Sequence, residues 1–429
     1  MYNIGLISLG CVKNTVDSEA LLAMFRQENL NITTDLNACD LIMINTCGFI
    51  LDAKIEAINV ILKALQYKKK TIVLGCLVER YEKELKTEFP EVNAFVSFDE
   101  YSKLPEIIDK VMNNQIIEKD FNIFNRVLST PSYMAYLKIS EGCDNFCAFC
   151  AIPFIRGRFR SFRMEELINY AKNLAKTGVK ELVVISQDTV SYGKDLKDGS
   201  NLYKLLNELD KIEGLEFIRV LYTYPQGIND DLLHLIANSK KITHYFDIPL
   251  QHCNNRVLKS MNRHDTKETI LDLYKRIKAI VPDATLRTTL IAGFPGETDE
   301  EFQELLEFVK EIRFNHVGVF TFSKEDGTKA ALLKDQISDE VKAERKDTLM
   351  SEQKHISYEL NKAMVGKTYK AIITKVLPNN EYELRASFNS PDDIDGSLIL
   401  QNSIVHEEGE MINVKITHAF VYDLLCEEI

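Results

Sequence analysis

Three cysteines lie close together in the stretch Glu141-Gly-Cys-Asp-Asn-Phe-Cys-Ala-Phe-Cys150. They are Cys143, Cys147 and Cys150, spaced C-x3-C-x2-C with no fourth cysteine nearby. A cubane iron–sulfur cluster has four irons, each normally held by a cysteine thiolate, so three thiolates leave one iron open to bind a small molecule. We call Cys143, Cys147 and Cys150 the second cysteine set, because another set precedes them in the chain. The second cysteine set predicts a 4Fe-4S cluster that carries out redox chemistry on a bound ligand.

A structural zinc site is the main alternative. Such a site is closed by four ligands, usually two C-x2-C pairs or a mixture of cysteine and histidine. This stretch offers one tight pair and a third cysteine, and no histidine occurs before His234. The nine cysteines are odd in number and scattered, which argues against a disulfide framework. The open-cornered cluster is favoured over zinc, disulfides and inert thiols.

The 429-residue length predicts about two to four domains. No apolar run approaches the roughly 20 residues that span a bilayer. The first residues lack the basic and apolar segments of a signal peptide, so we expect a cytoplasmic protein without membrane association. The net charge of −12 is a weak indication against nucleic acid and for small-molecule or basic-protein partners.

Three short apolar runs in the first 80 residues each lead to a cysteine. The runs are 4–9, 41–45 and 71–74, and the cysteines are Cys11, Cys47 and Cys76. Helix-like segments follow each run, which is typical of a parallel α/β sheet. Ligand sites in open parallel sheets lie beyond the carboxyl ends of the strands, so these cysteines should converge. We call Cys11, Cys47 and Cys76 the first cysteine set. This set predicts another open-cornered cluster, in addition to the one on the second cysteine set. Neighbouring glycines would permit close backbone approach, at Gly10, Gly48 and Gly75.

Polar residues follow Cys11 at the expected start of a helix, including Asn14, Asp17, Ser18 and Glu19. Asp17 or Ser18 is a suitable N-cap, because its side-chain oxygen accepts a hydrogen bond from an early backbone N–H. A role for these residues at the cysteine site is the alternative, and the sequence leaves both open.

Six strand–helix units follow from Tyr133. The predicted strands are 135–140, 181–186, 216–222, 245–249, 285–292 and 316–322, with helices such as 164–176, 265–280 and 299–312. Apolar, β-branched strands of this kind are typical of a parallel sheet covered on both faces. They predict a partial (β/α)6 barrel whose functional groups lie at the carboxyl ends of the strands.

Several polar or glycine-rich groups follow these strands, namely Gln187, Gln251, His252 and the segment Gly293-Phe-Pro-Gly-Glu297. Four arginines alternate with phenylalanines after the second cysteine set, at Arg156, Arg158, Arg160 and Arg163. The arginines fit either a solvated charge run or a basic rim that steers an anionic substrate.

The segment 338–363 is predicted to be one charged linking helix, and five short strands follow it. Short strands at this density predict a small β-barrel. Residues 366–429 hold 5 Lys or Arg and 11 Asp or Glu, a charge that fits a basic protein better than RNA. The expected domains are an N-terminal Rossmann-like α/β domain, the partial barrel and the small β-barrel, at 1–120, 130–364 and 366–429.

Together these motifs resemble the methylthiotransferases, a family of radical S-adenosylmethionine (SAM) enzymes. The second cysteine set, with Phe149 inside it, resembles the superfamily signature. The resemblance is narrowed from the superfamily to this family by three segments, Ser8-Leu-Gly-Cys-Val-Lys-Asn-Thr-Val-Asp-Ser-Glu19, Asn45-Thr-Cys-Gly48 and Gly75-Cys76. The last domain resembles the TRAM domain of the family. The resemblance covers essentially the whole chain.

The family has two branches, one modifying an adenosine in tRNA and the other an aspartate of small-subunit ribosomal protein twelve. The chain is more similar to the ribosomal branch, by Leu9-Gly-Cys-Val-Lys-Asn14, Gln251-His252 and the acidic segment 390–396. That branch implies ribosomal protein twelve as a basic substrate that docks on the acidic TRAM domain, and makes tRNA unlikely as a partner. A non-catalytic iron–sulfur carrier, the alternative from another class, usually closes its cluster with four cysteines.

The resemblance implies two 4Fe-4S clusters and SAM as cofactors, a sulfur donor, and an electron donor such as flavodoxin or ferredoxin. The second cysteine set would hold the cluster that binds and cleaves SAM, and the first set the cluster that carries the inserted sulfur. Around SAM we expect Phe149 and Ile152 at the adenine, Gly293, Gly296 and Glu297 at the ribose side, and Gln187 at the methionine end.

Overall fold

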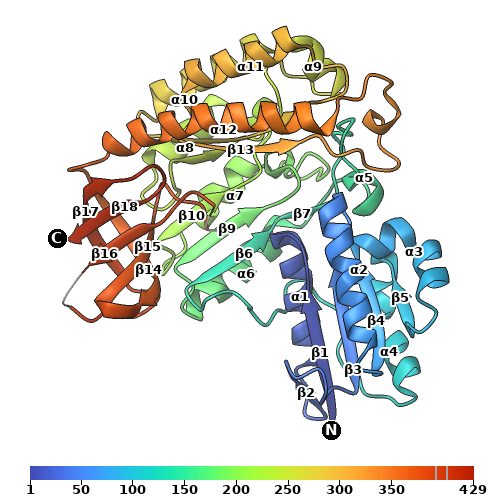
Figure 1. The fold of residues 1–429 in the computed structure, drawn as a ribbon. Coiled ribbons are helices and arrows are strands. Elements are labelled where there is room, and N and C mark those ends of the chain that lie inside the picture. The colour runs from blue at the N-terminus through green and yellow to red at the C-terminus, as the bar shows by residue number, and fades with distance from the viewer. Residues whose placement is uncertain (392–393, 402–403) are drawn as a thin grey trace. The chain divides into compact units, whose positions relative to one another are not determined.

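The computed structural model describes residues 1–391, 394–401 and 404–429. The chain forms two compact bodies (Figure 1). The first body is Met1–Thr130, Glu141–Arg160 and Glu325–Thr328, and the second is Pro131–Ser140, Ser161–Lys324 and Lys329–Ile429. The segment that carries the second cysteine set thus belongs to the same body as the first set.

The first body is built on a parallel sheet with the strand order β2-β1-β3-β4-β5. Its strands are β1 (Tyr2–Ser8), β2 (Leu30–Ile32), β3 (Leu41–Thr46), β4 (Lys70–Gly75) and β5 (Ala94–Val96). Its helices are α1 (Val12–Phe25), α2 (Leu51–Leu65), α3 (Cys76–Glu88), the 3-10 helix η1 (Phe98–Lys103), α4 (Leu104–Met112) and the single turn α5 (Ile152–Ile155). This confirms the predicted parallel α/β fold.

Strand β3 shows why this sheet has two apolar faces. Leu41 and Met43 pack with residues of α1 and α4, whereas Ile42 and Ile44 pack with residues of α2 and α3. Alternate side chains of a strand point to opposite faces, so a strand covered on both sides must be apolar throughout. The prediction missed β2 and β5, which are only three residues long.

The second body contains the predicted partial (β/α)6 barrel. Its parallel strands are β6 (Met134–Lys138), β9 (Glu181–Ile185), β10 (Phe217–Val220), β11 (Tyr245–Asp247), β12 (Thr285–Ala292) and β13 (His316–Thr321). They form two sheets, β10-β9-β6 and β11-β12-β13, and Ile218 of β10 makes an isolated bridge to Ile242, which lies just before β11. The intervening helices are α6 (Met164–Lys176), α7 (Leu202–Leu209), α8 (Asp230–Asn238), α9 (Asn255–Ser260), α10 (Lys267–Ile280) and α11 (Asp299–Ile312).

A long helix and a closed barrel complete this body (Figure 1). The helix is α12 (Asp339–Lys362), and the barrel order is β14-β15-β16-β18-β17. The barrel strands are β14 (Thr368–Leu377), β15 (Glu381–Ala386), β16 (Leu398–Gln401), β17 (Met411–Ala419) and β18 (Leu424–Glu428). Two-residue strands are β7 (Ser140–Glu141) and β8 (Arg160–Ser161), and further 3-10 turns are η2 (Thr189–Ser191), η3 (Pro225–Gly227), η4 (Ala330–Leu332) and η5 (Pro378–Asn380).

Buried charges fasten the small barrel to the (β/α)6 strands. Glu181 of β9 lies between Arg219 of β10 and Arg385 of β15, and Arg385 Nε donates to Glu181 Oε2 at 2.9 Å. Arg219 Nη1 also donates to the Ser387 carbonyl at 3.1 Å. The two guanidinium groups hold the pKa of the fully buried Glu181 carboxyl below its usual value, against the effect of burial.

The acidic segment 390–396 is not a uniformly exposed patch. Asp395 is buried, accepts from Ser390 N at 2.8 Å, bonds the Tyr245 hydroxyl and lies 3.4 Å from Arg287. The Asp395 carboxylate therefore interacts with residues inside the second body rather than facing solvent. Asp392 and Asp393 lie outside the described residues.

Among the described residues, none of the helices combines the length and apolar character that a membrane span requires.

Candidate active site

The first cysteine set lies at one edge of the first body's sheet. Cys11 is the N-cap of α1 after β1, Cys47 directly follows β3, and Cys76 follows β4 as the first residue of α3. Strands β1, β3 and β4 are parallel neighbours, so their carboxyl ends lie side by side. The structure thus brings these three cysteines together, and their sulfurs lie within electrostatic range of one another.

Glycines allow the loops of this edge to approach closely. Gly10 has φ +89°, and a Cβ there would lie 2.6 Å from the Cys47 Cβ. A Cβ at Gly48 would lie 2.7 Å from the Leu77 Cα, and Gly75 has φ +95°. Residues with a side chain would therefore push the cysteine loops apart or strain the backbone.

Two asparagines tie the strand ends together. Asn14 Nδ2 donates to the Leu9 carbonyl at 2.6 Å and to the Thr46 carbonyl at 3.3 Å. Asn45 Nδ2 donates to the Asn14 carbonyl at 3.1 Å and to Ser18 Oγ at 2.8 Å. These buried amides hold the loop of Cys11 against the end of β3.

The capping alternative for Asp17 and Ser18 is wrong, because Cys11 is the N-cap of α1 and makes no side-chain capping bond. Asp17 Oδ2 instead pairs with Arg156 Nη1 at 2.6 Å, and Ser18 Oγ donates to Ser8 Oγ at 2.7 Å. Glu19 pairs with Arg126 at 3.3 Å. These buried side chains fix α1 beneath the cysteines.

The second cysteine set lies in a loop that closes on itself. Cys143 N donates to the Gly157 carbonyl at 3.2 Å, and Cys150 N donates to the Cys147 carbonyl at 3.0 Å. Asp144 Oδ1 accepts from Phe159 N at 3.1 Å and lies 2.7 Å from Arg158 Nε. The ends of the loop therefore meet through local contacts.

The predicted SAM contacts are divided between the two bodies. Phe149 and Ile152, both half-buried, lie in the first body beside the second cysteine set. Gln187 follows β9 and the segment Gly293–Glu297 follows β12, both in the second body. Each of these second-body residues lies at the carboxyl end of a barrel strand, and their role in binding SAM stays a prediction.

Glu297 holds the glycine-rich segment in shape. Its Oε2 accepts from the backbone N–H of Gly293 at 3.0 Å and of Phe294 at 3.1 Å. Its Oε1 accepts from Arg345 Nη1 of α12 at 2.9 Å. Burial raises the pKa of the Glu297 carboxyl, and Arg345 opposes that rise. Both carboxylate oxygens are thus engaged by groups of the protein itself.

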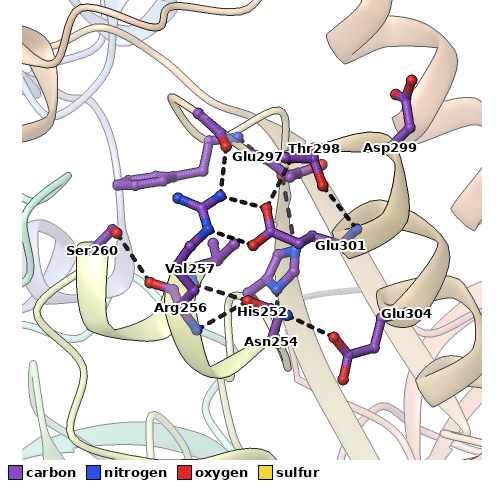
Figure 2. Close-up of polar contacts among 12 residues, drawn as sticks. His252, Asn254, Arg256, Val257, Ser260, Glu297, Thr298, Asp299, Glu301 and Glu304 are labelled. Carbon is purple, nitrogen blue, oxygen red and sulfur yellow. Dashed lines mark hydrogen bonds and ion pairs between the residues drawn. The ribbon is translucent and has the colours of Figure 1, made fainter.

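A polar network extends from this loop to α9 and α11 (Figure 2). Arg256 pairs with Glu301 and donates to the Gly296 carbonyl at 2.5 Å, and Asn254 Nδ2 donates to Glu304 at 2.6 Å. His252 Nε2 lies 3.8 Å from Glu297 Oε2. Burial lowers the pKa of His252 to about 4, so its imidazole is neutral at pH 7.

The sequence interpretation missed Arg345 and Arg156, which occur in charged stretches. The spacing of the buried positions of α12 was a usable signal, since Lys342, Arg345, Leu349, Gln353 and Ile356 recur every three or four residues. Arg156 is buried, in contrast to Arg158, and fits neither the solvated run nor the basic rim.

The cysteine sets have the chemistry that open-cornered clusters require. Burial raises the pKa of the Cys47 thiol and raises the pKa of the Cys76 thiol to about 12. The positive charge of Arg156 opposes both increases. A bound metal would deprotonate such thiols, because thiolates are the ligands. Among the described residues, no group of three or more His, Cys, Asp or Glu is arranged to hold a single metal ion. Each thiolate of a cubane binds a different iron, so its ligands do not converge on one point.

Family models match three parts of the chain. Residues 3–97 match the uncharacterized protein family UPF0004, residues 137–309 match the radical SAM superfamily, and residues 365–429 match the TRAM domain. The match around the second cysteine set, together with the partial barrel, defines the class as a radical SAM enzyme.

Curated relatives narrow this class. The chain is 44% identical over its whole length to the ribosomal protein uS12 methylthiotransferase RimO of Clostridium novyi (strain NT), and covers 99% of that protein. It is also 44% identical to the protein of the same name from Thermoanaerobacter sp. (strain X514), with full coverage of both chains. The chain belongs to the RimO family of radical SAM methylthiotransferases.

Solved structures share the fold. The radical SAM methyltransferase TsrM from Kitasatospora setae, with cobalamin and a [4Fe-4S] cluster bound, has a TM-score of 0.57 at 12% identity over 75% of each chain. The cobalamin-dependent SAM radical enzyme OxsB has a TM-score of 0.53 at 14% identity, over 83% of this chain and 56% of its own.

Proposed function

We propose that this chain adds a methylthio group to the β-carbon of an aspartate in small-subunit ribosomal protein uS12. The observation that carries this proposal is the 44% identity to uS12 methylthiotransferases along the whole chain. The two cysteine sets in one body support it, because such an enzyme needs one cluster for radical generation and another for sulfur.

The six cysteines are the ligands in this proposal. Cys143, Cys147 and Cys150 hold the cluster that binds SAM, and Cys11, Cys47 and Cys76 hold the cluster that carries sulfur. When bound, these groups supply one-electron cleavage of SAM and the sulfur to be inserted, while a second SAM supplies the methyl group. We assign the first cluster to a domain at 1–120, SAM binding to 130–364 and substrate docking to the TRAM domain at 366–429.

The chain's other residues position SAM. Phe149 and Ile152 contact the adenine, Gln187 donates to or accepts from the methionine end, and Gly293 and Gly296 allow close approach on the ribose side. Glu297 keeps these glycines in place through its bonds to the Gly293 and Phe294 N–H groups. Arg345 in turn neutralises the Glu297 charge.

The substrate and partners follow from charge and chemistry. Residues 366–429 carry more than twice as many acidic as basic residues, which suits a basic ribosomal protein. A low-potential donor such as flavodoxin or ferredoxin supplies electrons, and a separate donor supplies sulfur. The enzyme works in the cytoplasm, where ribosomal proteins are made.

An anaerobic assay of the reconstituted protein tests the function. Reactions contain SAM, reductant and sulfide, with uS12 or bulk tRNA in parallel, and mass spectrometry reads the products. A methylthio mass gain on uS12 alone supports the proposal, whereas a gain on tRNA alone contradicts it.

The variant Cys76→Ala separates the two clusters. We expect it to keep SAM cleavage and to lose methylthio product, because alanine cannot replace a thiolate ligand. Cys39→Ala is the matched control, since Cys39 is also buried in the first body and has no ligand role in the proposal. Methylthio product from Cys76→Ala would contradict the role of the first set.

A further inference from the structure

Arg156 differs from the basic residues that follow it. Its side chain is 2% exposed, whereas that of Arg158 is 73% exposed. Arg156 directly follows α5, in the segment that carries the second cysteine set. Burying a guanidinium is costly unless partners satisfy its charge and N–H groups, so its contacts indicate why it is buried.

Most partners of Arg156 belong to the first cysteine set's surroundings. Nη1 lies 2.6 Å from Asp17 Oδ2, and Nη2 donates to Asn14 Oδ1 at 3.0 Å. Both partners lie in α1 just after Cys11. The guanidinium also lies over the Phe98 ring, 4.1 Å from its centroid. These contacts fix the plane and direction of the guanidinium.

The same guanidinium reaches a cysteine of the first set. Arg156 Nη2 donates to Cys76 Sγ at 3.6 Å. Cys76 also packs with Ala151 and Ile155 of the segment that precedes Arg156. In the protein with its cluster bound, this sulfur would be a thiolate. The hydrogen bond from the guanidinium N–H would then be stronger than the one to a thiol, because the acceptor is charged.

We propose that Arg156 is a positioning residue of the first cluster, which donates a hydrogen bond to the Cys76 thiolate and raises the reduction potential of that cluster. The segment that holds one cluster thereby adjusts the other. This inference rests on the proposed function, because it requires a cluster on Cys11, Cys47 and Cys76.

The direction of the effect follows from charge. Reduction adds an electron to an already anionic site, and a buried cation favours the more negative state. Hydrogen bonds to cluster sulfurs and outer-shell charges are among the factors that set such potentials. Loss of Arg156 therefore makes the potential more negative. Lysine keeps the charge but cannot serve Asp17, Asn14 and Cys76 together, because it lacks the planar fork.

The test uses the full chain with Cys143, Cys147 and Cys150 changed to alanine, so that only the first cluster is observed. The reconstituted parent is compared with Arg156→Gln and Arg156→Lys in a redox titration followed by electron paramagnetic resonance. Arg126→Gln is the matched control, because Arg126 is equally buried and pairs with Glu19 of the same helix α1. We expect both Arg156 variants to have more negative midpoint potentials and the control to match the parent.

The outcomes separate this inference from the proposed function. A parent that binds no iron overturns the assignment of the first cluster and the inference with it. A parent with a cluster whose potential Arg156→Gln leaves unchanged overturns the inference alone, as does an equal shift in Arg126→Gln. Should Arg156→Gln retain no cluster, the potential of Arg156→Lys decides in the same way.

Discussion

The two cysteine sets are assembled in different ways. The first set comes from three strand ends spread over residues 11–76, and the second from one loop between Cys143 and Cys150. The first set exists only when β1, β3 and β4 are paired in register, whereas local hydrogen bonds close the loop of the second.

This difference has an energetic consequence. Ordering segments that are far apart costs chain entropy, which the packing of the whole sheet must offset. A change in one strand end should therefore affect all three ligands of the first set. A substitution within the loop of the second set should affect only neighbouring residues. The second set should therefore tolerate more substitutions than the first set.

The largest expected effect comes from Gly75→Ala. Gly75 has φ +95°, and a Cβ there would meet the Asn45 side chain and lie 2.6 Å from the Thr46 carbonyl oxygen. The end of β4 would have to move away from β3, and Cys76 with it. We expect the chain to lose about four irons, while the second cluster and SAM cleavage remain. Iron and sulfide analysis and a cleavage assay measure this.

The control for Gly75→Ala is Gly178→Ala. Gly178 has a similar φ of +102°, but a Cβ there would meet nothing within 4 Å. Both variants carry the backbone strain, and only one carries the close approach. Equal iron content in the two variants would mean that close packing at the strand ends is not what assembles the first set.

The glycine-rich loop of the second body, residues 293–297, is also held by a segment distant in the sequence, helix α12. We therefore expect it to be as sensitive to single substitutions as the first cysteine set. Arg345 of α12 neutralises the buried Glu297, which holds the Gly293 and Phe294 N–H groups. Arg345→Gln leaves that carboxylate unpaired, and we expect a loss of about 3–5 kcal/mol in the free energy of unfolding. Urea titration measures the loss.

Arg313→Gln is the control for Arg345→Gln. Arg313 pairs with Glu359, which is also in α12, but both side chains are largely exposed, so the expected loss is below about 1 kcal/mol. The double variant Glu297→Gln with Arg345→Gln should be more stable than Arg345→Gln, because no buried charge is then left unpaired; the other partner of Arg345, Asp299, is exposed to solvent. A similar loss for Arg313→Gln and Arg345→Gln would contradict the importance of the buried pair.

The same contrast explains what the sequence could predict. Strand β3 was predictable from its apolar run and β12 from its β-branched and apolar residues, and the positions of Cys47 and Cys76 followed from the runs before them. The spacing of the second set needed no fold at all. The predicted strands 41–45 and 285–292 therefore lie within a residue of those observed.

What the sequence did not predict depends on contacts between distant segments. Arg156 and Arg345 are ordinary members of charged runs until Asp17 and Glu297 are brought beside them. Asp395 was interpreted as part of an acidic surface, and Arg287 and Tyr245 bury it. Charge patterns describe surfaces well, but they do not identify a charge that has a buried partner.

A smaller effect is expected from the pH dependence of the second body. The pKa of His252 is about 4 in the folded chain, below the usual 6.5 or so of an exposed histidine. The unfolded chain takes up this proton first, so stability present above about pH 6.5 is lost as the pH falls towards 4. We expect this histidine to account for about 3 kcal/mol of the loss between pH 7 and pH 4.

His252→Gln isolates that contribution, because glutamine does not titrate and can accept the bond that Asn254 N donates to His252 Nδ1 at 3.0 Å. Unfolding by urea is measured for both proteins at pH 7 and pH 4. The variant should lose less stability than the parent over this interval. Equal losses in the two proteins would show that His252 is not buried in its neutral form.

The smallest effect is expected from Asp144→Ala, within the loop of the second set. Asp144 is 43% exposed at its side chain, and it accepts from Phe159 N and pairs with Arg158. The backbone bond from Cys143 N to the Gly157 carbonyl does not need it. Stability should fall by less than about 1 kcal/mol. In a background with Cys11, Cys47 and Cys76 changed to alanine, the iron content should stay at that of the parent. Loss of this cluster in Asp144→Ala would mean that the loop needs side-chain support beyond its own spacing, and the contrast between the two sets would then disappear.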